Sequence, residues 1–181
     1  MAQYAGDIEL SEEAGAAIRW ARRMLEPGAA VILDTETTDL DGVVIEIAVI
    51  DACTGATLLD TLVDPAGEPI SPGAYAAHGI SAAELEGAQP WAEVLPTLRK
   101  VTKDRQILAY NADFDLGVIR RTTARAGLRL RHLDTPANWG CIMDRRSDWA
   151  GTRRRLPLRG GHRALADCRH ALDVLRGMAG P

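Results

Sequence analysis

The order of apolar and polar residues divides the chain into short strands and amphipathic helices. Three apolar runs of strand length come first, and the short breaks between them contain glycine, which favours three antiparallel neighbours. These runs cover residues 29–34, 42–51 and 56–64. Further apolar runs at residues 106–110 and 129–134 predict a fourth and a fifth strand.

Segments with a helical spacing of apolar residues lie between and after the later strands. The predicted helices cover residues 90–101, 113–128, 139–149 and 162–178. Three strands followed by alternating helices and strands indicate an α/β fold, with a mixed five-stranded sheet flanked by helices. The first strand is then expected at the centre of the sheet.

One more helix is predicted before the first strand. Ser11 can cap its amino end, and the sequence EPG stops it shortly before the strand begins. Its packing stripe is expected to consist of Ile18, Arg22 and Leu25. We therefore expect two parts, an N-terminal helical extension at residues 1–28 and a main domain at residues 29–181.

The composition is that of an ordinary globular protein. The 181 residues suffice for one domain with a core, and the apolar fraction of 46% and charged fraction of 25% exclude a disordered or fibrous chain. Three cysteines without CxxC spacing argue against a disulfide framework and a zinc knuckle. No run approaches the length of a membrane span, and acidic residues near the start are unlike a secretory signal. We expect a soluble chain in the cytoplasm.

Charge is distributed unevenly along the chain. The net charge is −4, yet eight arginines stand between residues 145 and 169. Such a stretch is either a solvated loop or a contact surface for nucleic acid. It includes His162 and Asp167, which belong to the candidate site described below, and this position favours the second interpretation.

Two acidic residues directly follow the first strand. Asp34 and Glu36 are two positions apart, so on a strand their side chains point to the same face. Adjacent carboxylates repel, and either a nearby cation or open solvent must offset this repulsion. Ligands of α/β sheets bind outside the carboxyl ends of the strands, which is where this pair lies.

Two later segments place acids in similar positions. Asp113 and Asp115 lie where a strand passes into a helix, and His162 and Asp167 lie near the start of the last helix. Each alone has an ordinary explanation as a helix cap or a solvated residue. Four carboxylates and one histidine at element boundaries together indicate divalent cations with hard oxygen ligands, Mg²⁺ or Mn²⁺ rather than Zn²⁺.

The sequence resembles a known family at three motifs. "DTETT", "NADFD" and "HRALAD" are similar to the three exonuclease motifs of the DnaQ-like, or DEDDh, 3′→5′ exonucleases, the family of the proofreading epsilon subunit of bacterial DNA polymerase III. "VVIEIAVI" and "AAHGIS" stand where that family has its second strand and its HGI segment. The resemblance implies a ribonuclease H-like fold and an exonuclease domain at residues 29–181. It also implies hydrolysis from the 3′ end of single-stranded DNA, RNA or short oligonucleotides, which releases nucleoside 5′-monophosphates.

The same resemblance implies roles for single residues. The ligands of two divalent metal ions would be Asp34, Glu36, Asp115 and Asp167, and His162 would be the general base that takes a proton from the attacking water. Asp113 is not the motif acid. The substrate contacts would come from Thr37, Leu40, Glu46, His78, Ile80 and Asn111. For Leu40 and Ile80, which would wedge against the last base, core packing is the alternative.

The chain departs from the family pattern at one substrate-side position. Tyr110 stands where the family often has a histidine, so the contact of that histidine is not carried over. No polymerase-tethering segment is recognisable. The expected partner is nucleic acid with a free 3′ end, and no membrane.

Two other functions stay open at this point. One is a small-nucleotide or dinucleotide hydrolase of the same fold, and the other is a non-catalytic nucleic-acid-binding module that uses residues 145–169. DNA and RNA also both remain as substrates, because sugar discrimination depends on contacts to the 2′ position that spacing does not reveal.

Overall fold

A mixed five-stranded sheet forms the centre of the protein. The computed structural model describes residues 11–158 and 160–180, so the first ten residues of the predicted N-terminal extension lie outside the described residues. The strands are β1 (Ala30–Thr37), β2 (Val44–Asp51), β3 (Thr57–Leu62), β4 (Gln106–Ala109) and β5 (Trp139–Cys141). Their spatial order is β3-β2-β1-β4-β5, which confirms the predicted α/β fold and the central position of the first strand.

The connections explain why the sheet is mixed. β1, β2 and β3 are antiparallel neighbours joined by short turns, as their spacing predicts. β4 pairs parallel with β1, and β5 parallel with β4. The helices between them provide the crossovers that parallel strands need.

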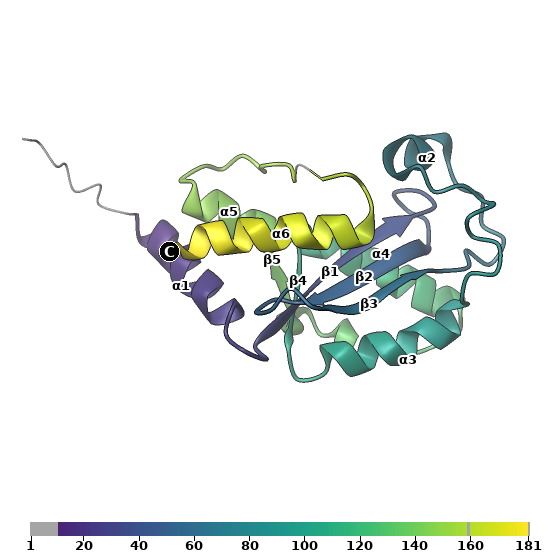
Figure 1. Cartoon of the computed structure of the whole chain (residues 1–181), viewed down its shortest axis with the longest axis horizontal. Helices are drawn as coiled ribbons and strands as arrows, with labels where there is room; N and C mark the ends of the chain where they lie inside the picture. Colours follow the sequence, from purple (N-terminus) through teal and green to yellow (C-terminus); the bar gives the residue numbers. More distant parts are fainter. Residues whose placement is uncertain (1–10, 159, 181) are drawn as a thin grey trace, which may run out of the picture.

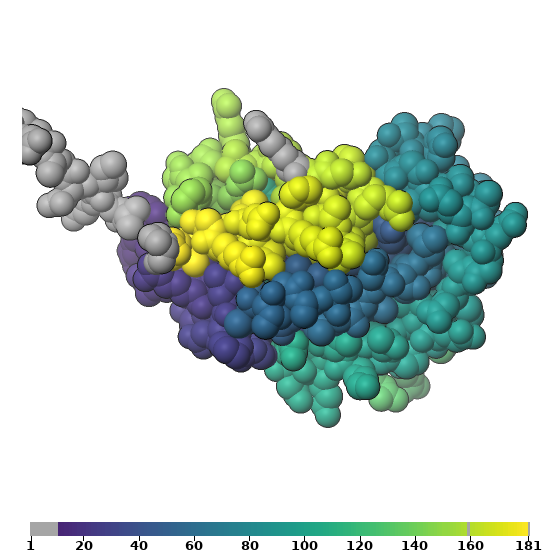
Figure 2. All heavy atoms as spheres, viewed as in Figure 1, coloured from purple at the N-terminus to yellow at the C-terminus, as the bar shows by residue number. Residues whose placement is uncertain are grey.

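Helices cover both faces of the sheet (Figure 1). One face packs on α1 (Glu12–Met24), α5 (Ile142–Trp149) and α6 (Ala164–Ala179). The other face packs on α3 (Trp91–Thr102) and α4 (Ala112–Arg125), while the short α2 (Pro72–His78) lies beyond the carboxyl end of β1. Figure 2 shows α6 in yellow along the face of the sheet that it covers, and α1 in purple beside the carboxyl end of α6.

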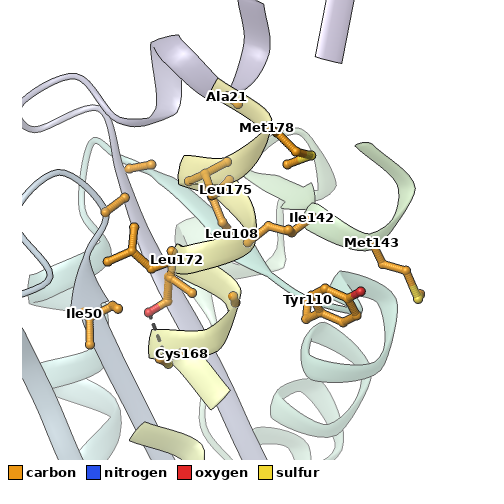
Figure 3. Close-up of a cluster of buried hydrophobic side chains, with 14 of the residues drawn as sticks. Ala21, Ile50, Leu108, Tyr110, Ile142, Met143, Cys168, Leu172, Leu175 and Met178 are labelled. Carbon is orange, nitrogen blue, oxygen red and sulfur yellow. Dashed lines mark hydrogen bonds between the residues drawn. The ribbon is translucent and has the colours of Figure 1, made fainter. Parts of the chain in front are cut away.

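Burial of both faces explains the continuous apolar runs of the central strands. On β1, Val31 and Leu33 enter the core with α3 and α4, whereas Ile32 enters the core with α6. In the core that α6 covers, Cys168, Leu172 and Leu175 lie along this helix over the sheet (Figure 3). Alternation along β1 therefore decides which helix layer each later side chain of the strand faces.

The prediction of the fifth strand was wrong. Residues 129–134 contain a 3₁₀ turn, η1 (Arg131–Asp134), which is followed by a second turn, η2 (Pro136–Asn138). Leu130 and Leu133 are three positions apart, and a helical turn buries both in the core with α3 and α4. The true fifth strand takes the first three residues of the predicted helix at 139–149, because Trp139 pairs with Ile107 of β4.

The N-terminal helix forms as predicted, but it packs through other residues. The amide of Ala14 donates to Ser11 Oγ at 3.1 Å, which confirms the cap. Ala14, Ala17 and Ala21 form the buried stripe in place of Ile18, Arg22 and Leu25, because small side chains let α1 approach α5 and α6 closely. The boundary between residues 28 and 29 stays a prediction. Within the described residues, no helix is both long and apolar enough to cross a membrane.

Candidate active site

The acidic pair lies at the carboxyl end of β1. By alternation, Asp34 and Glu36 continue the face of Ile32, so they point toward the layer of α6. Thr35 points to the opposite side, where its hydroxyl donates to Asp115 Oδ1 at 2.9 Å. This buried hydrogen bond fixes the first turn of α4 against β1.

The amino end of α6 is fixed to β2 by an ion pair between the buried carboxylate of Glu46 and the exposed Arg163. Glu46 lies opposite Glu36 in the register of the two strands. Arg163 donates to both carboxylate oxygens of Glu46, the shortest contact being 2.7 Å from Nη2 to Oε1, and the Ala164 amide donates to Oε2 at 2.8 Å. The carboxylate thereby caps the helix and balances the arginine. As a result, the first turn of α6, which carries Asp167, is held beside β1.

The backbone before α6 has a special conformation. His162 is exposed and has a φ of 50°, in the left-handed region that few non-glycine residues adopt. A Cβ atom at Gly160 would collide with Oδ1 of Asp167, so glycine is required there. Within the described residues, Glu36, His162 and Asp167 each offer a potential ligand atom within 4.8 Å of the others.

Three acidic residues of the site have raised pKa values, so their charged forms are disfavoured. Burial raises the pKa of Asp34 well above its usual range, and neighbouring carboxylates raise it further. Burial and the charge of Asp167 raise the pKa of Glu36 to about 8. Burial also raises the pKa of Asp115 to about 7, against the opposing hydrogen bond from Thr35. Such shifts indicate that the positive charge near these carboxylates is too small to stabilise their charged forms.

A divalent cation fits this donor set. Oδ1 of Asp167 is buried without a hydrogen-bond partner among the described residues. Arg163 pairs with Glu46, and His170 Nδ1 lies 3.6 Å from Oδ1 of Asp167, beyond hydrogen-bond distance. Buried carboxylate oxygens without a hydrogen-bond donor suit Mg²⁺ and Mn²⁺, which prefer hard oxygen ligands.

The four acidic residues predicted as metal ligands and His162 line one cleft of about 590 Å³. Nine of the eleven residues predicted from the sequence lie on its wall. They are Asp34, Glu36, Thr37, Leu40, His78, Asn111, Asp115, His162 and Asp167. The side chain of Leu40 is 76% exposed, so its apolar surface is available at the edge of the cleft.

The other two predicted residues lie outside this wall. Glu46 is occupied by Arg163 and the amino end of α6. Ile80 is completely buried and packs with Ile45 and Leu85, which is the packing alternative expected for it from the sequence. Both residues support the site from behind.

His78 braces the backbone of the first motif. It is buried, and the Ile80 amide donates to its Nδ1 at 2.9 Å. The proton of the neutral ring is therefore on Nε2, which donates to the Thr37 carbonyl at 3.2 Å. Burial lowers the pKa of His78, in keeping with this neutral form.

Sequence reasoning missed a clamp on the loop that leads to His162. The Tyr110 hydroxyl donates to the Leu156 carbonyl, and Arg146 Nη1 donates to this hydroxyl at 2.7 Å and to the Pro157 carbonyl at 3.2 Å. Tyr110 also lines the cleft. The partners are far apart in sequence, and only the departure from the family pattern at Tyr110 pointed to this position.

Several arginines of the arginine-rich stretch make contacts within the fold. Arg146 belongs to the clamp and Arg163 to the ion pair with Glu46, whereas Arg145 pairs with Asp148 and lies over the ring of Trp20. The exposed charges in the described part of the loop are Arg153, Arg154 and Arg155. Arg159 lies outside the described residues.

Comparisons with known proteins identify the family. A family model, RNase_T, described as exonuclease, matches residues 31–175. An uncharacterized exonuclease of Escherichia phage 186 is 30% identical over 88% of this chain and 92% of that protein. A DNA polymerase III subunit epsilon-like protein of Rhodobacter capsulatus is 34% identical over 59% of this chain, which spans only 16% of that protein. The chain belongs to the RNase_T exonuclease family, and the predicted resemblance to DnaQ-like exonucleases is confirmed.

Solved structures agree with this assignment. Exonuclease X, in complex with 5′-overhanging duplex DNA, has a TM-score of 0.55 and 28% identity over 84% of this chain and 93% of that chain. Escherichia coli exonuclease I, in complex with an oligonucleotide, has a TM-score of 0.60 over 80% of this chain and 39% of that chain. At 14% identity, the second likeness shows the fold alone. The fold is therefore ribonuclease H-like, as the resemblance implied.

Proposed function

We propose that the protein is a metal-dependent 3′→5′ exonuclease that releases nucleoside 5′-monophosphates from nucleic acid. The observation that carries this proposal is the meeting of five side chains in one cleft, Asp34, Glu36, Asp115, His162 and Asp167. They come from β1, α4 and the start of α6, so only the folded chain brings them together. Membership of the exonuclease family supports the same reaction.

The acidic residues would hold two divalent ions. Asp34, Glu36, Asp115 and Asp167 supply oxygen ligands, and their raised pKa values and the unpartnered Oδ1 of Asp167 fit cations at this place. When bound, such ions increase the acidity of water and stabilise negative charge on the leaving oxygen of a phosphodiester. Arg163 and Glu46 hold the helix that carries Asp167.

His162 would act as the general base. Its exposed position at the mouth of the cleft gives it access to a water molecule beside the scissile phosphate. Gly160 and the clamp of Tyr110 and Arg146 keep the preceding loop near the acidic residues. The histidine then takes the proton of the attacking water and returns it to solvent.

The 3′-terminal nucleotide would lie between α2 and α4. The hydrogen bond from His78 fixes the Thr37 carbonyl, and the backbone held in this way would contact the terminal 3′-hydroxyl. Leu40, at the edge of the cleft, offers an apolar surface for the last base, and Asn111 offers an amide opposite. These contacts would hold a free 3′ end in the cleft.

A labelled-strand experiment tests this proposal. Single-stranded DNA, single-stranded RNA, a duplex with recessed 3′ ends and a dinucleotide, each labelled at the 5′ end, are incubated with Mg²⁺ or Mn²⁺. We expect a ladder of products that shorten one nucleotide at a time, nucleoside 5′-monophosphates as the released species, and no reaction with chelator. Asp34→Ala should abolish the activity. Products released as oligonucleotides, or full activity of Asp34→Ala, would overturn the proposal, and cleavage of the dinucleotide alone would assign a small-nucleotide hydrolase.

A further inference from the structure

A second concave region lies at the other end of the sheet. It has a volume of about 920 Å³ and lies between the carboxyl end of α3, the start of β4 and the turn η1. We call it the basic cleft, and its basic residues are Arg99, Lys100, Lys103, Arg105, Arg131 and His132. In Figure 1, α2 lies at the arrowhead of β1, whereas the start of β4 lies at the opposite end of the strand.

The charge of the basic cleft is largely uncompensated. Asp104 is the one acidic residue among those that line it, on a chain whose net charge is −4. Arg105 pairs with Asp51 at 3.1 Å. Within the described residues, Lys100, Lys103 and Arg131 form no ion pair and are exposed. Three exposed cations are therefore available to a ligand.

Arg99 adds an unpartnered donor to the same wall. Its Nε atom is buried and has no hydrogen-bond partner among the described residues. Burial lowers the pKa of Arg99, and the nearby charge of Arg131 lowers it further. An anion in the cleft would relieve both effects, because it would accept from the guanidinium and offset the repulsion.

The walls of the basic cleft are fixed by the fold. Thr102 is completely buried, and its hydroxyl donates to the Leu98 carbonyl at 2.7 Å. Since this hydroxyl proton is used, His132 Nε2 donates to Thr102 Oγ1 over 2.9 Å. Residue 131 has a φ of 60°, a conformation that persists for a non-glycine residue only where its surroundings impose it. Arg131 thus lines the same cleft as Lys100 of α3 and Lys103, which follows this helix.

Helix stability alone does not explain this gathering of charge. Basic residues in the last turn of a helix interact favourably with its dipole, which accounts for Arg99 and Lys100 on α3. Arg131 comes from η1, some thirty residues later, and Lys103 lies beyond the last turn. The helix dipole therefore does not explain why Lys103 and Arg131 also line the basic cleft.

We propose that the basic cleft binds the phosphodiester backbone of a nucleic-acid strand, as an accessory site separate from the active site. This inference rests on the proposed function, since the strand would be the one that the enzyme shortens. Gln106, at the cleft, pairs with Ala30, and Glu36 follows six residues along β1, which corresponds to about 20 Å. At about 3.4 Å per nucleotide of a stacked strand, on the order of six nucleotides separate the two sites. Short substrates therefore cannot contact both.

Charge reversal with a matched control tests the accessory site. Lys100→Glu with Lys103→Glu is compared with Arg19→Glu and Arg23→Glu, two exposed positions on α1 that produce the same change in net charge. Affinity for a 30-nucleotide strand is measured with chelator present over a range of salt concentrations, and hydrolysis of this strand and of a dinucleotide is measured with Mg²⁺. The glutamine variants at Lys100 and Lys103 serve as a milder second pair.

The lysine variant is expected to lose affinity for the long strand by about tenfold or more. The slope of log affinity against log salt should become shallower by about 1.4, which is the loss of two phosphate contacts. KM for the long strand should rise while kcat and dinucleotide hydrolysis are unchanged, and the glutamine pair should show a smaller effect of the same kind. An equal effect of both charge reversals, no effect of either, or a loss of dinucleotide hydrolysis would overturn the accessory site. If the unmodified protein binds the strand but hydrolyses nothing, the proposed function fails while the binding comparison still tests the cleft.

Discussion

His162 is the residue whose predicted role depends most directly on geometry. It stands at the mouth of the cleft in a left-handed conformation, next to acidic residues that are suited to metal ions. We expect His162→Ala to lower kcat by about 10²- to 10⁴-fold, the usual contribution of a general base, with Mn²⁺ binding largely retained. Single-turnover hydrolysis and a Mn²⁺ titration measure the two effects. Loss of Mn²⁺ binding in this variant would instead make the histidine a ligand.

Two adjacent glycines provide a second test at the residue scale. A methyl group at Gly160 would collide with Asp167, whereas one at Gly161 would meet no atom within 4 Å. Gly160→Ala should therefore displace Asp167 or the loop, weaken Mn²⁺ binding and lower activity at least tenfold, while Gly161→Ala should behave as the unmodified protein. Calorimetric Mn²⁺ binding and kcat distinguish the two variants. Equal behaviour would show that the loop adapts without cost.

The sequence could predict the acidic residues because their chemistry restricts the residue types. Two carboxylates spaced for one face of a strand, with two more at element boundaries, are enough to indicate a shared metal site. The roles of Glu46 and Ile80 could not be read in this way. An acid and an apolar residue of these types serve equally well in a core or in a binding site, and the partner that decides for Glu46, Arg163, lies 117 residues away.

At the scale of elements, the loop before α6 depends on the clamp formed by Tyr110 and Arg146. Tyr110→Phe removes the hydroxyl that links Leu156 to α5. A hydrogen bond with a charged donor contributes about 1.5–3 kcal/mol to stability, so we expect Tm to fall by several degrees. We also expect kcat/KM to fall by about tenfold or more, because the loop before His162 loses its support. Tyr75→Phe, at an exposed position of α2, is the control. If both variants retain full activity, the clamp does not position His162.

The elements themselves were predicted where the apolar pattern is long and regular. The three antiparallel strands and the last helix follow from continuous runs and caps. The fifth strand could not be predicted, because β5 has three residues and is defined by pairing with β4 rather than by its own pattern. Leu130 and Leu133 fit a strand edge and a helical turn equally well, and the core with α3 and α4 selects the turn.

At the scale of the whole molecule, stability should depend on pH and metal together. The folded-state pKa values of Glu36 and Asp115, about 8 and about 7, lie above the values of an unfolded chain. At a pH between the unfolded and the folded pKa of each group, the folded state binds more protons than the unfolded state. Without metal, the stabilisation is therefore greatest at low pH, and it is lost as the pH rises through the folded pKa values of about 7 and 8. Tm measured with chelator should fall over this range, and Mg²⁺ should reduce the fall. Glu36→Gln should flatten the chelator curve, and a rising Tm would contradict the electrostatics of the cleft.

The overall architecture could be anticipated from the order of strands and helices, whereas the basic cleft could not. Its residues come from α3, β4 and η1, and none of them forms a motif. Only the parallel pairing of β4 with β1 brings these segments to one end of the sheet and the acidic residues to the other. A topological relation of this kind is a property of the assembled sheet rather than of any segment.

We propose that four carboxylates from three separate segments of the chain hold divalent ions in one cleft. Anomalous diffraction from a crystal soaked with Mn²⁺ and a nucleoside 5′-monophosphate tests it most directly. We expect two Mn²⁺ peaks bounded by Asp34, Glu36, Asp115 and Asp167, with the phosphate beside them and His162 within reach of the phosphate. A map without Mn²⁺ among these oxygens, although Mn²⁺ supports hydrolysis in solution, would contradict it.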